Sequence, residues 1–309
     1  MTAPPTVGVV IATCDRGDAV VRTIDSILAN PVAPDGIWVV DQSSDERTRE
    51  ALRPYEDSGS CVCFGTPVRG LSRAHNLAIR QVDSEIVALT DDDCEVSTDW
   101  IGAIARAFED PEIGLVFGNA VPAEHDSRAG LITGYVRAEP VVARTLEDKV
   151  VIDGLGACMA FRRTVWQCVG GFDEMLGAGT RLRAANDGDL AVRALRAGFA
   201  VAETPAISVV HHGYRAWPEA RDLLCGYALG TGAMLTKHLR AGTPHIPRLF
   251  ARLGLRFLSG RRHPPARLGG NRFAAARLLA FLRGCVTGLS TPIDRETLRF
   301  VSREGRARS

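Results

Sequence analysis

The feature that most constrains the fold is a regular alternation of two apolar patterns over the first 120 residues. Continuous apolar runs rich in β-branched residues, such as VGVVIAT, are typical of strands buried on both faces. Between these runs lie segments with helical apolar spacing, such as DAVVRTIDSILA. We expect strands at 7–13, 36–41, 61–64, 85–90 and 113–121, and helices at 18–29, 44–55, 71–82 and 98–108.

Strands that alternate with helices over these lengths form βαβ units. The predicted fold class is therefore α/β, with a mostly parallel sheet covered by helices on both faces. Residues 125–150 are less regular, and we expect a mobile loop or short helices there. Regular patterns resume with 153–174, a helix at 187–198 that Gly198 ends, strands at 199–203 and 206–212, and a helical segment from about 216 onward.

The charge of the chain is distributed unevenly. The whole chain of 309 residues has a net charge of +1, which predicts no bulk polyelectrolyte partner. Residues 237–309, however, contain one Lys and fifteen Arg against three acids, a balance of +13 that leaves −12 for the rest. A basic tail on an acidic body indicates an anionic partner, either a membrane surface or a nucleic acid.

Targeting patterns and cysteine usage bear on the compartment. The N-terminal stretch MTAPPTVGVV has neither a basic region nor a cleavage-site pattern, so we expect no signal peptide. No stretch reaches the ~20 uninterrupted apolar residues of a spanning helix. The eight cysteines form no CxxC pair or zinc spacing, which favours reduced thiols in a cytoplasmic protein.

Carboxylates follow three of the predicted strands: Asp15 the first, Asp41 the second, and Asp91, Asp92 and Asp93 the fourth. Parallel sheets bind ligands beyond the carboxyl ends of their strands. Three adjacent acids often form a solvated turn, but at the end of a buried strand their mutual repulsion favours a divalent cation. Mg²⁺ and Mn²⁺ suit such oxygen-rich sites. Asp91 and Asp93 can reach one cation, whereas we expect Asp92 to point elsewhere and to tolerate substitution best.

Other polar residues each allow two interpretations. Asp41 either contacts a base or ribose or caps the following turn. Asp187 and Asp189 open a helix, where capping explains one of them and leaves the other free as a general base. His211 and His212 follow a strand and point to opposite faces, so at most one can complete a metal site.

Five segments, in this order, resemble the family-2-like inverting glycosyltransferases with the GT-A fold, a Rossmann-like α/β fold. They are VGVVIATCDRGDAVVRTIDSIL, IWVVDQSSDE, RGLSRAHNLAI, EIVALTDDDCEVSTDWI, and GACMAFRRTVWQCVGGFDEMLGAGT followed by NDGDLAVRALRAG. The resemblance covers residues 6–215. It implies a GT-A domain at 1–215, with a nucleotide-binding half at 1–122 and an acceptor-side half at 123–215. The charge and the helical pattern of the remaining residues predict a separate basic, helical, membrane-associating segment at 216–309.

The resemblance also implies roles for individual residues. The nucleotide-sugar contacts would be Thr13, Asp15, Asp41, Arg73, Asn76, Asp91 and Asp92. The metal, Mg²⁺ or Mn²⁺, would be held by Asp91, Asp93 and either His211 or His212. Asp187 would be the catalytic base that deprotonates the acceptor hydroxyl. The acceptor cleft would be shaped by Gly156, Ala157, Cys158, Gly171, Phe172 and Asp173.

Two departures from the family pattern affect these roles. Asn186 replaces a usual Glu beside the base, and Gln42 leaves the choice of nucleotide open. The implied activity is metal-dependent, inverting transfer from a UDP-, dTDP- or GDP-sugar to an acceptor hydroxyl, in cell-envelope or exopolysaccharide assembly. A nucleotidyltransferase would need a Gly-rich phosphate loop where this chain has TCDRGD. A non-catalytic nucleotide-sugar-binding protein would have lost the metal acids or the base.

The basic segment at 246–289 interleaves Leu and Phe with Arg. It is either a helical subdomain with a solvated arginine face or an interfacial segment on anionic lipid. The second interpretation suits a lipid-linked acceptor and predicts a peripheral protein on the inner face of the cell membrane. Nucleic acid is a less suitable partner because the segment has no aromatic stacking pattern.

Overall fold

The structure, a computed structural model, describes residues 4–259 and 270–301. Its main sheet has nine strands, which are β1 (Val7–Thr13), β2 (Gly36–Asp41), β3 (Val62–Gly65), β4 (Ile86–Asp91), β5 (Cys94–Val96), β6 (Ile113–Pro122), β8 (Val141–Ala143), β9 (Cys158–Arg162) and β10 (Ala200–His211). The strand order is β3-β2-β1-β4-β9-β6-β10-β5, and β8 pairs with β10. Two short strands, β7 (Gly130–Ile132) and β11 (Tyr214–Ala216), form a second sheet.

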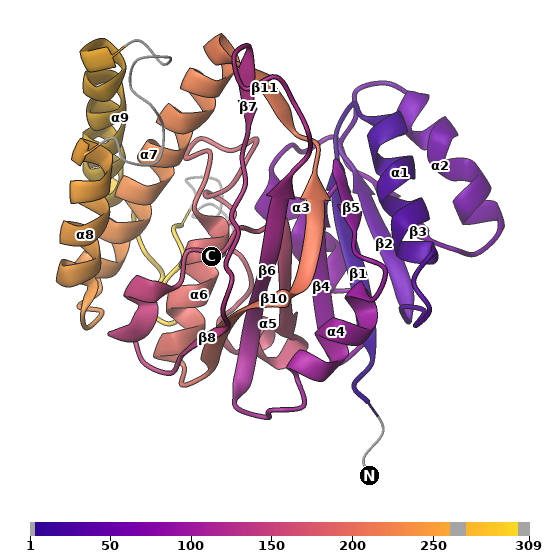
Figure 1. Cartoon of the computed structure of the whole chain (residues 1–309). Coiled ribbons are helices and arrows are strands. Elements are labelled where there is room, and N and C mark those ends of the chain that lie inside the picture. The colour runs from indigo at the N-terminus through magenta and orange to yellow at the C-terminus, as the bar shows by residue number, and fades with distance from the viewer. Residues whose placement is uncertain (1–3, 260–269, 302–309) are drawn as a thin grey trace.

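Helices cover both faces of the main sheet, as predicted (Figure 1). One face packs on α1 (Gly17–Leu28), α2 (Arg47–Asp57) and α4 (Trp100–Ala107), and the other on α3 (Leu71–Ile79), α5 (Arg163–Cys168) and α6 (Asn186–Arg196). Strand β1 shows why: Val9 and Ile11 enter the first core, whereas Val10, one residue out of phase, enters the second. The continuous apolar pattern of this strand therefore reflects burial on both faces.

The mostly parallel sheet is confirmed, with one arrangement that the local pattern did not reveal. Strand β9 lies between β4 and β6 and is antiparallel to both. The remaining central pairs, β1 with β2, β1 with β4 and β6 with β10, are parallel. The carboxyl ends of β1, β2 and β4 consequently share one edge of the sheet.

Three local predictions differ from the structure. The helix expected at 44–55 is α2, which begins at Arg47 and continues through Pro54 to Asp57. The two strands expected at 199–203 and 206–212 are one strand, β10, with a register shift between Glu203 and Ser208. The region 125–150 contains the strands β7 and β8 and a 3-10 helix at Asp148–Val151, elements of three or four residues that are too short to leave a periodic pattern.

Three C-terminal helices, α7 (Trp217–Arg240), α8 (Ile246–Ser259) and α9 (Gly270–Ser290), lie side by side at one end of the molecule (Figure 1). A side chain at Gly232 or Gly284 would collide with the backbone of the facing helix, so α7 and α9 pack closely. Lys237 and His238 of α7 are fully buried. The expected segment boundary at 216 lies beside the start of α7. The burial of Lys237 and His238, however, joins α7 to the rest of the structure. The division into domains stays a prediction.

Helix α9 is the one helix in the described parts of the chain that is long and apolar enough to cross a membrane by length and composition. It has 21 residues and a mean hydropathy of 1.3. Part of the predicted basic segment, at 260–269 and 302–309, lies outside the described residues.

Candidate active site

The strand register places the predicted polar residues at one edge of the sheet. Thr13 on β1 lies opposite Asp41 on β2, and Ala12 lies opposite Asp91 on β4. Residues that are up to 79 positions apart in the chain therefore come together, because parallel strands align their carboxyl ends. The edge predicted from sequence to hold the site is thus the edge where these residues meet.

The three consecutive aspartates have different environments. Asp92 is only 6% exposed, and its Oδ2 accepts a hydrogen bond of 2.8 Å from the Thr13 hydroxyl. Its Oδ1 lies 3.0 Å from Nη1 of Arg16. The same Nη1 lies 2.7 Å from Oδ2 of Asp93. Arg16 thus bridges Asp92 and Asp93, and the buried partners of Asp92 do not agree with the expectation that it tolerates substitution best. Its contact with a nucleotide stays a prediction.

Asp93 faces His211 across the junction of β5 and β10. Nε2 of His211 lies 3.2 Å from the buried Oδ1 of Asp93, and Nδ1 lies 2.6 Å from the carbonyl oxygen of Thr133. Because a carbonyl only accepts, Nδ1 carries a hydrogen, which leaves Nε2 to donate to Asp93 when the ring is protonated and to offer its lone pair to a cation when the ring is neutral. His212 points the other way, with Nε2 2.8 Å from Glu95. Adjacent residues at the end of a strand face opposite sides, so of the two alternatives His211 is the one beside Asp93, and its role as a metal ligand stays a prediction.

The charges of Asp91 and Asp93 shift the pKa values of their neighbours, as expected for a site that lacks enough positive charge. Burial, followed by the Asp93 carboxylate, raises the pKa of Asp91 to about 7. Burial also acts to raise the pKa of Asp93, but His211, Arg16 and Arg215 outweigh it and hold that pKa below its usual value. Burial opposes protonation of His211, yet Asp93 and Asp91 raise its pKa. A cation at this point would relieve the repulsion that these shifts report.

The donors fit a divalent cation. In the described part of the chain, the possible ligand atoms of Asp93, Cys94 and His211 lie within 4.8 Å of one another. Burial raises the pKa of the Cys94 thiol, so that side chain stays neutral and is a poor ligand for Mg²⁺ or Mn²⁺. A Cβ on Gly213 would lie 2.6 Å from Nε2 of His211 and 3.0 Å from Oδ2 of Asp93, so only glycine leaves this space open. Asp91 is not part of the tight group, and its role as a ligand stays a prediction.

Asp15 and Asp41 organise the loops beside the acids. Oδ1 of Asp15 accepts hydrogen bonds from the backbone and hydroxyl of Ser44, and Oδ2 lies 2.8 Å from Nη2 of Arg69. Oδ1 of Asp41 accepts from the Ser43 backbone at 2.9 Å, which is the turn-capping contact considered above. Asp15 has a φ of 57°, a left-handed conformation that Asp tolerates because its short side chain bonds locally. Their contacts with a nucleotide stay predictions.

The structure gives Asn76 a role different from the predicted one. Its amide is 1% exposed, and Oδ1 accepts from the Phe172 backbone at 2.9 Å and from the Trp166 indole at 3.0 Å. Nδ2 donates to the Phe172 carbonyl and to Glu174, both at 3.0 Å. These four bonds use the full capacity of an amide, so Asn76 ties α3 to the 166–174 segment and has nothing left for a sugar. Arg73, 3.6 Å from Glu174, is half-exposed and remains a candidate.

The two acids of α6 have separate functions. Oδ2 of Asp187 accepts from the Gly156 backbone at 2.9 Å, which brings the predicted base and a predicted acceptor-side residue together. Asp189 is fully buried and contacts Arg193, Lys237 and His238. Of the two, only Asp187 is accessible, which agrees with its selection as the base.

Most of the other predicted acceptor-side residues lie in the core. Ala157 and Cys158 are buried at the start of β9, and burial raises the pKa of Cys158 to about 12. Phe172 packs against aromatic rings of the second core. Asp173 is fully buried beside Lys237, and the Gly171 carbonyl accepts from Arg193. These side chains therefore anchor the segment in the core, and a role in shaping an acceptor cleft stays a prediction.

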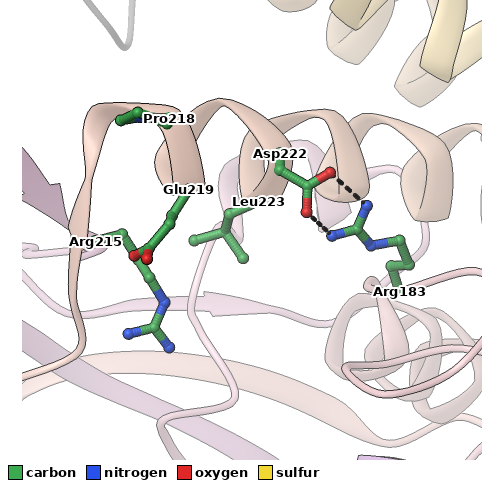
Figure 2. A pocket seen from close by; sticks show the side chains of 6 residues that line it. All are labelled: Arg183, Arg215, Pro218, Glu219, Asp222 and Leu223. Atoms are coloured by element: carbon green, nitrogen blue, oxygen red, sulfur yellow. Dashed lines mark hydrogen bonds and ion pairs between the residues drawn. The ribbon is translucent and has the colours of Figure 1, made fainter.

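An open cavity of about 590 Å³ lies beside the N-terminal turns of α7. Figure 2 shows its lining, in which Arg183 and Asp222 form an ion pair through two contacts. The lining residues are Arg183, Arg215, Pro218, Glu219, Asp222 and Leu223. The charge of Arg215 also lowers the pKa of Asp93, so the cavity lies within electrostatic reach of the acids.

Several residues of the site escaped the sequence analysis. Arg16, Gly213 and Arg215 are single residues in loops or a short strand, with no spacing that marks them. Only the position of Arg16, three residues after a strand end, could have drawn attention to it.

The strand order, the covering helices and the acids at the strand ends define a GT-A glycosyltransferase. The match of the glycosyl transferase family 2 model to residues 8–170, more than half of the chain, gives the family more narrowly. The chain belongs to glycosyl transferase family 2 and is a glycosyltransferase.

Solved structures with this fold include several glycosyltransferases. The mannosyltransferase PcManGT from Pyrobaculum calidifontis, in complex with GDP-Man and Mn²⁺, is 22% identical with a TM-score of 0.61, over 94% of this chain and 77% of that one. GalNAc-T7 with UDP, GalNAc and Mn²⁺ is 18% identical with a TM-score of 0.53, over 72% and 47%. S. aureus TarS 1-349 is 13% identical with a TM-score of 0.53, over 91% and 90%.

A curated relative is the O-antigen biosynthesis protein RfbC of Myxococcus xanthus. It is 24% identical to this chain over 225 residues, which cover 67% of the chain. The chain spans only 17% of the length of that relative.

Proposed function

We propose that this glycosyltransferase is metal-dependent and inverting, and that it moves a sugar from a nucleotide-sugar to an acceptor hydroxyl in cell-envelope glycan assembly. The observation that carries the proposal is the meeting of Asp93 and His211 at the strand edge, beside the end of β4 where Asp91 lies. The half-buried Tyr227 lies within electrostatic reach of both Asp91 and Asp187: burial is the main cause of its raised pKa, and the charges of these two acids add to it.

The residues present would hold a divalent cation through Asp93 and His211, with Asp91 as a further candidate. Such a cation, when bound, neutralises charge on the donor diphosphate as it departs. Thr133 orients His211 through its Nδ1, and Asp92 holds Arg16 and Thr13 beside the acids. Asp187 would accept the proton of the acceptor hydroxyl at a carboxylate oxygen, oriented by the Gly156 N–H. Attack from the face opposite the leaving group inverts the anomeric carbon.

The nucleotide and the metal are proposed by similarity. The named complexes of PcManGT and GalNAc-T7 contain Mn²⁺ with GDP-Man or with UDP and GalNAc, which supports Mn²⁺ and a GDP- or UDP-linked donor here. The relative named for O-antigen biosynthesis supports an acceptor in cell-envelope polysaccharide. The cavity beside α7 supports an acceptor recess, because it opens within reach of the same acids.

The exposed face of α9 supports a peripheral position on an anionic membrane. Leu279, Leu282, Val286 and Leu289 are each at least half exposed, with Val286 at 64%. The cation Arg283 lies beside them in a groove of about 480 Å³ between α7 and α9. An apolar face with arginine at its rim suits a headgroup boundary. Sedimentation with anionic vesicles should remove the protein from solution, and a Leu282→Glu, Val286→Glu double variant should stay in the supernatant. Equal binding of both would contradict a role for this face.

The activity is tested first by donor binding. We expect one class of nucleotide-sugar to raise the melting temperature in the presence of Mn²⁺, and Asp93→Ala to lose this Mn²⁺-dependent shift. The absence of a shift with any UDP-, dTDP- or GDP-sugar would contradict the proposal.

The base is tested separately. Asp187→Asn should abolish transfer while the donor-dependent thermal shift stays nearly intact, because the carboxylate acts on the acceptor. A fully active Asp187→Asn variant would show that another group takes the proton.

A further inference from the structure

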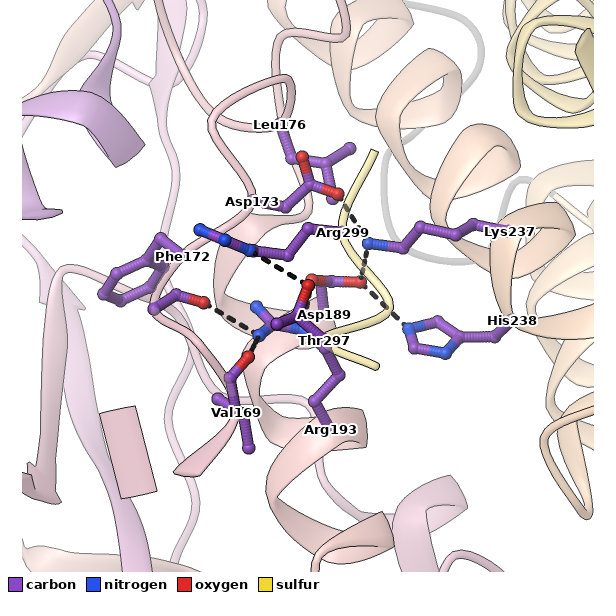
Figure 3. A network of polar contacts seen from close by, with 12 residues as sticks. Val169, Phe172, Asp173, Leu176, Asp189, Arg193, Lys237, His238, Thr297 and Arg299 are labelled. Carbon is purple, nitrogen blue, oxygen red and sulfur yellow. Dashed lines mark hydrogen bonds and ion pairs between the residues drawn. The ribbon is translucent and has the colours of Figure 1, made fainter. Parts of the chain in front are cut away.

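A network of buried charges lies behind the proposed base, outside the segment matched by the family model. Figure 3 shows how α7 directs two side chains into the start of α6. None of the members is more than 3% exposed, and they are Asp173, Asp189, Arg193, Lys237 and His238.

Lys237 bridges two carboxylates from different segments. Its Nζ lies 2.6 Å from Oδ2 of Asp173 and 2.6 Å from Oδ1 of Asp189. Asp189 also accepts from Nε2 of His238 at 2.9 Å and, through Oδ2, from Nε of Arg193 at 2.9 Å. Asp173 in turn accepts from the Phe300 backbone at 2.8 Å. The network therefore joins α6, the loop before it, α7 and the chain near residue 300.

The charges in this network balance. Burial lowers the pKa of His238, so its ring is neutral and donates from Nε2. Burial acts to raise the pKa of Asp189, but Lys237, Arg193 and His238 outweigh it and keep that carboxylate ionised. Two carboxylates thus face two cations, Arg193 and Lys237. Buried ion pairs of this kind add little net stability compared with apolar residues, but they fix geometry because each partner has few alternatives.

The geometry that they fix is that of the first turn of α6. Asp189 lies two residues after Asp187 in that turn. Ala185, immediately before the helix, has a φ of 70°, so the chain enters α6 through a left-handed residue. A displacement of Asp189 would therefore rotate the turn and alter the 2.9 Å contact between Asp187 and Gly156.

We propose that Lys237 is a positioning residue for the proposed base, and that it acts through Asp189 from the C-terminal helices. The inference rests on the proposed function of Asp187. It makes α7 part of the catalytic unit and not an appendage to it. Lys237 contacts Asp173 and Asp189 and none of the predicted nucleotide-sugar contacts, so its effect should fall on the chemical step and leave the donor site unchanged.

The test uses two variants of the full chain. The Asp173→Asn, Lys237→Met double variant removes one charge of each sign and leaves Asp189 paired with Arg193. His238→Ala removes a neutral contact to Asp189 and leaves the ionic balance as it is. The assay measures release of nucleoside diphosphate, with water as the acceptor, from the nucleotide-sugar selected in the thermal screen. Circular dichroism and Mn²⁺-dependent thermal shifts check the fold and donor binding.

We expect the double variant to fold, to bind the donor with an unchanged KM, and to lose kcat by tenfold or more. His238→Ala should lose kcat by a smaller factor, again with an unchanged donor KM. A wild-type kcat in either folded variant would overturn the inference. A loss that falls on the donor KM would also overturn it, because it would indicate a general distortion of the core. If the wild-type protein releases no nucleotide from any donor, the proposed function fails and not this inference alone.

Discussion

Gly213 offers the sharpest test of the proposed metal site. It lies between β10 and β11, where a Cβ would approach Nε2 of His211 to 2.6 Å, Cε1 to 2.9 Å and Oδ2 of Asp93 to 3.0 Å. Gly213 does not have a left-handed φ, so alanine can adopt its backbone without strain. Any effect of Gly213→Ala should therefore come from the collision with the two proposed ligands.

The size of the effect follows from these distances. An ordinary contact begins near 3.4 Å, so the imidazole must move by roughly 0.8 Å. A metal ligand must lie within about 0.2 Å of its ideal distance. The displaced imidazole therefore leaves the set of metal ligands or distorts its geometry. Changes around a ligand that alter its position reduce metal affinity by about 10–100-fold. We expect Mn²⁺ binding to weaken by about 1.4–2.8 kcal/mol.

Isothermal titration with Mn²⁺ measures this affinity directly, and thermal unfolding checks that the variant is folded. Gly65→Ala is the matched control, because its Cβ would meet nothing nearer than Arg49 Nη1 at 4.0 Å. A folded Gly213→Ala protein that binds Mn²⁺ as tightly as the control would refute the reasoning, since His211 could not then be a ligand.

Three further predictions follow. Arg16→Gln should tighten Mn²⁺ binding about fivefold in the same titration, because the half-exposed Arg16 guanidinium competes with the cation for the acids by about 1 kcal/mol. An unchanged Mn²⁺ affinity would show that Arg16 does not compete with the cation. His211→Ala should weaken Mn²⁺ binding and His212→Ala should not, so equal effects would contradict the assigned orientation. Burial lowers the pKa of His75 to about 4, so between pH 6.5 and 4 the unfolded chain binds more protons and stability falls as the pH drops. From pH 7 to 5 this residue should cost about 2 kcal/mol in urea unfolding, a loss that His75→Phe removes; an equal loss in both proteins would count against this origin.

The helices and strands of the α/β domain were largely predictable because their signal is local. Strands β1, β2 and β4 each carry their burial in their own apolar run, and the acids at their ends are adjacent to those runs in sequence. The prediction that these acids meet at one edge needed only the rule for parallel strands. The insertion of β9 between β4 and β6 was not predictable, because its antiparallel pairing depends on partners far away in the chain.

Individual roles depended on contacts that no local pattern contains. Asn76 and Asp173 were both predicted as site residues from their motifs, yet long-range packing buries both. Asp187 and Asp189 are equivalent as helix-opening acids, and only the arrival of α7 with Lys237 distinguishes them. His211 and His212 are likewise separated only by which of them meets Asp93.

The sequence by itself determined the class of fold, the edge of the sheet that carries the site, and the kinds of ligand available there. These follow from periodicity and from residue chemistry, which are properties of short segments. The tertiary structure alone decided which carboxylate is buried with a cation, which is accessible, and which histidine faces the acids. Burial and charge pairing are set by residues up to 127 positions apart, as between Asp173 and Phe300, and a local pattern carries no record of them.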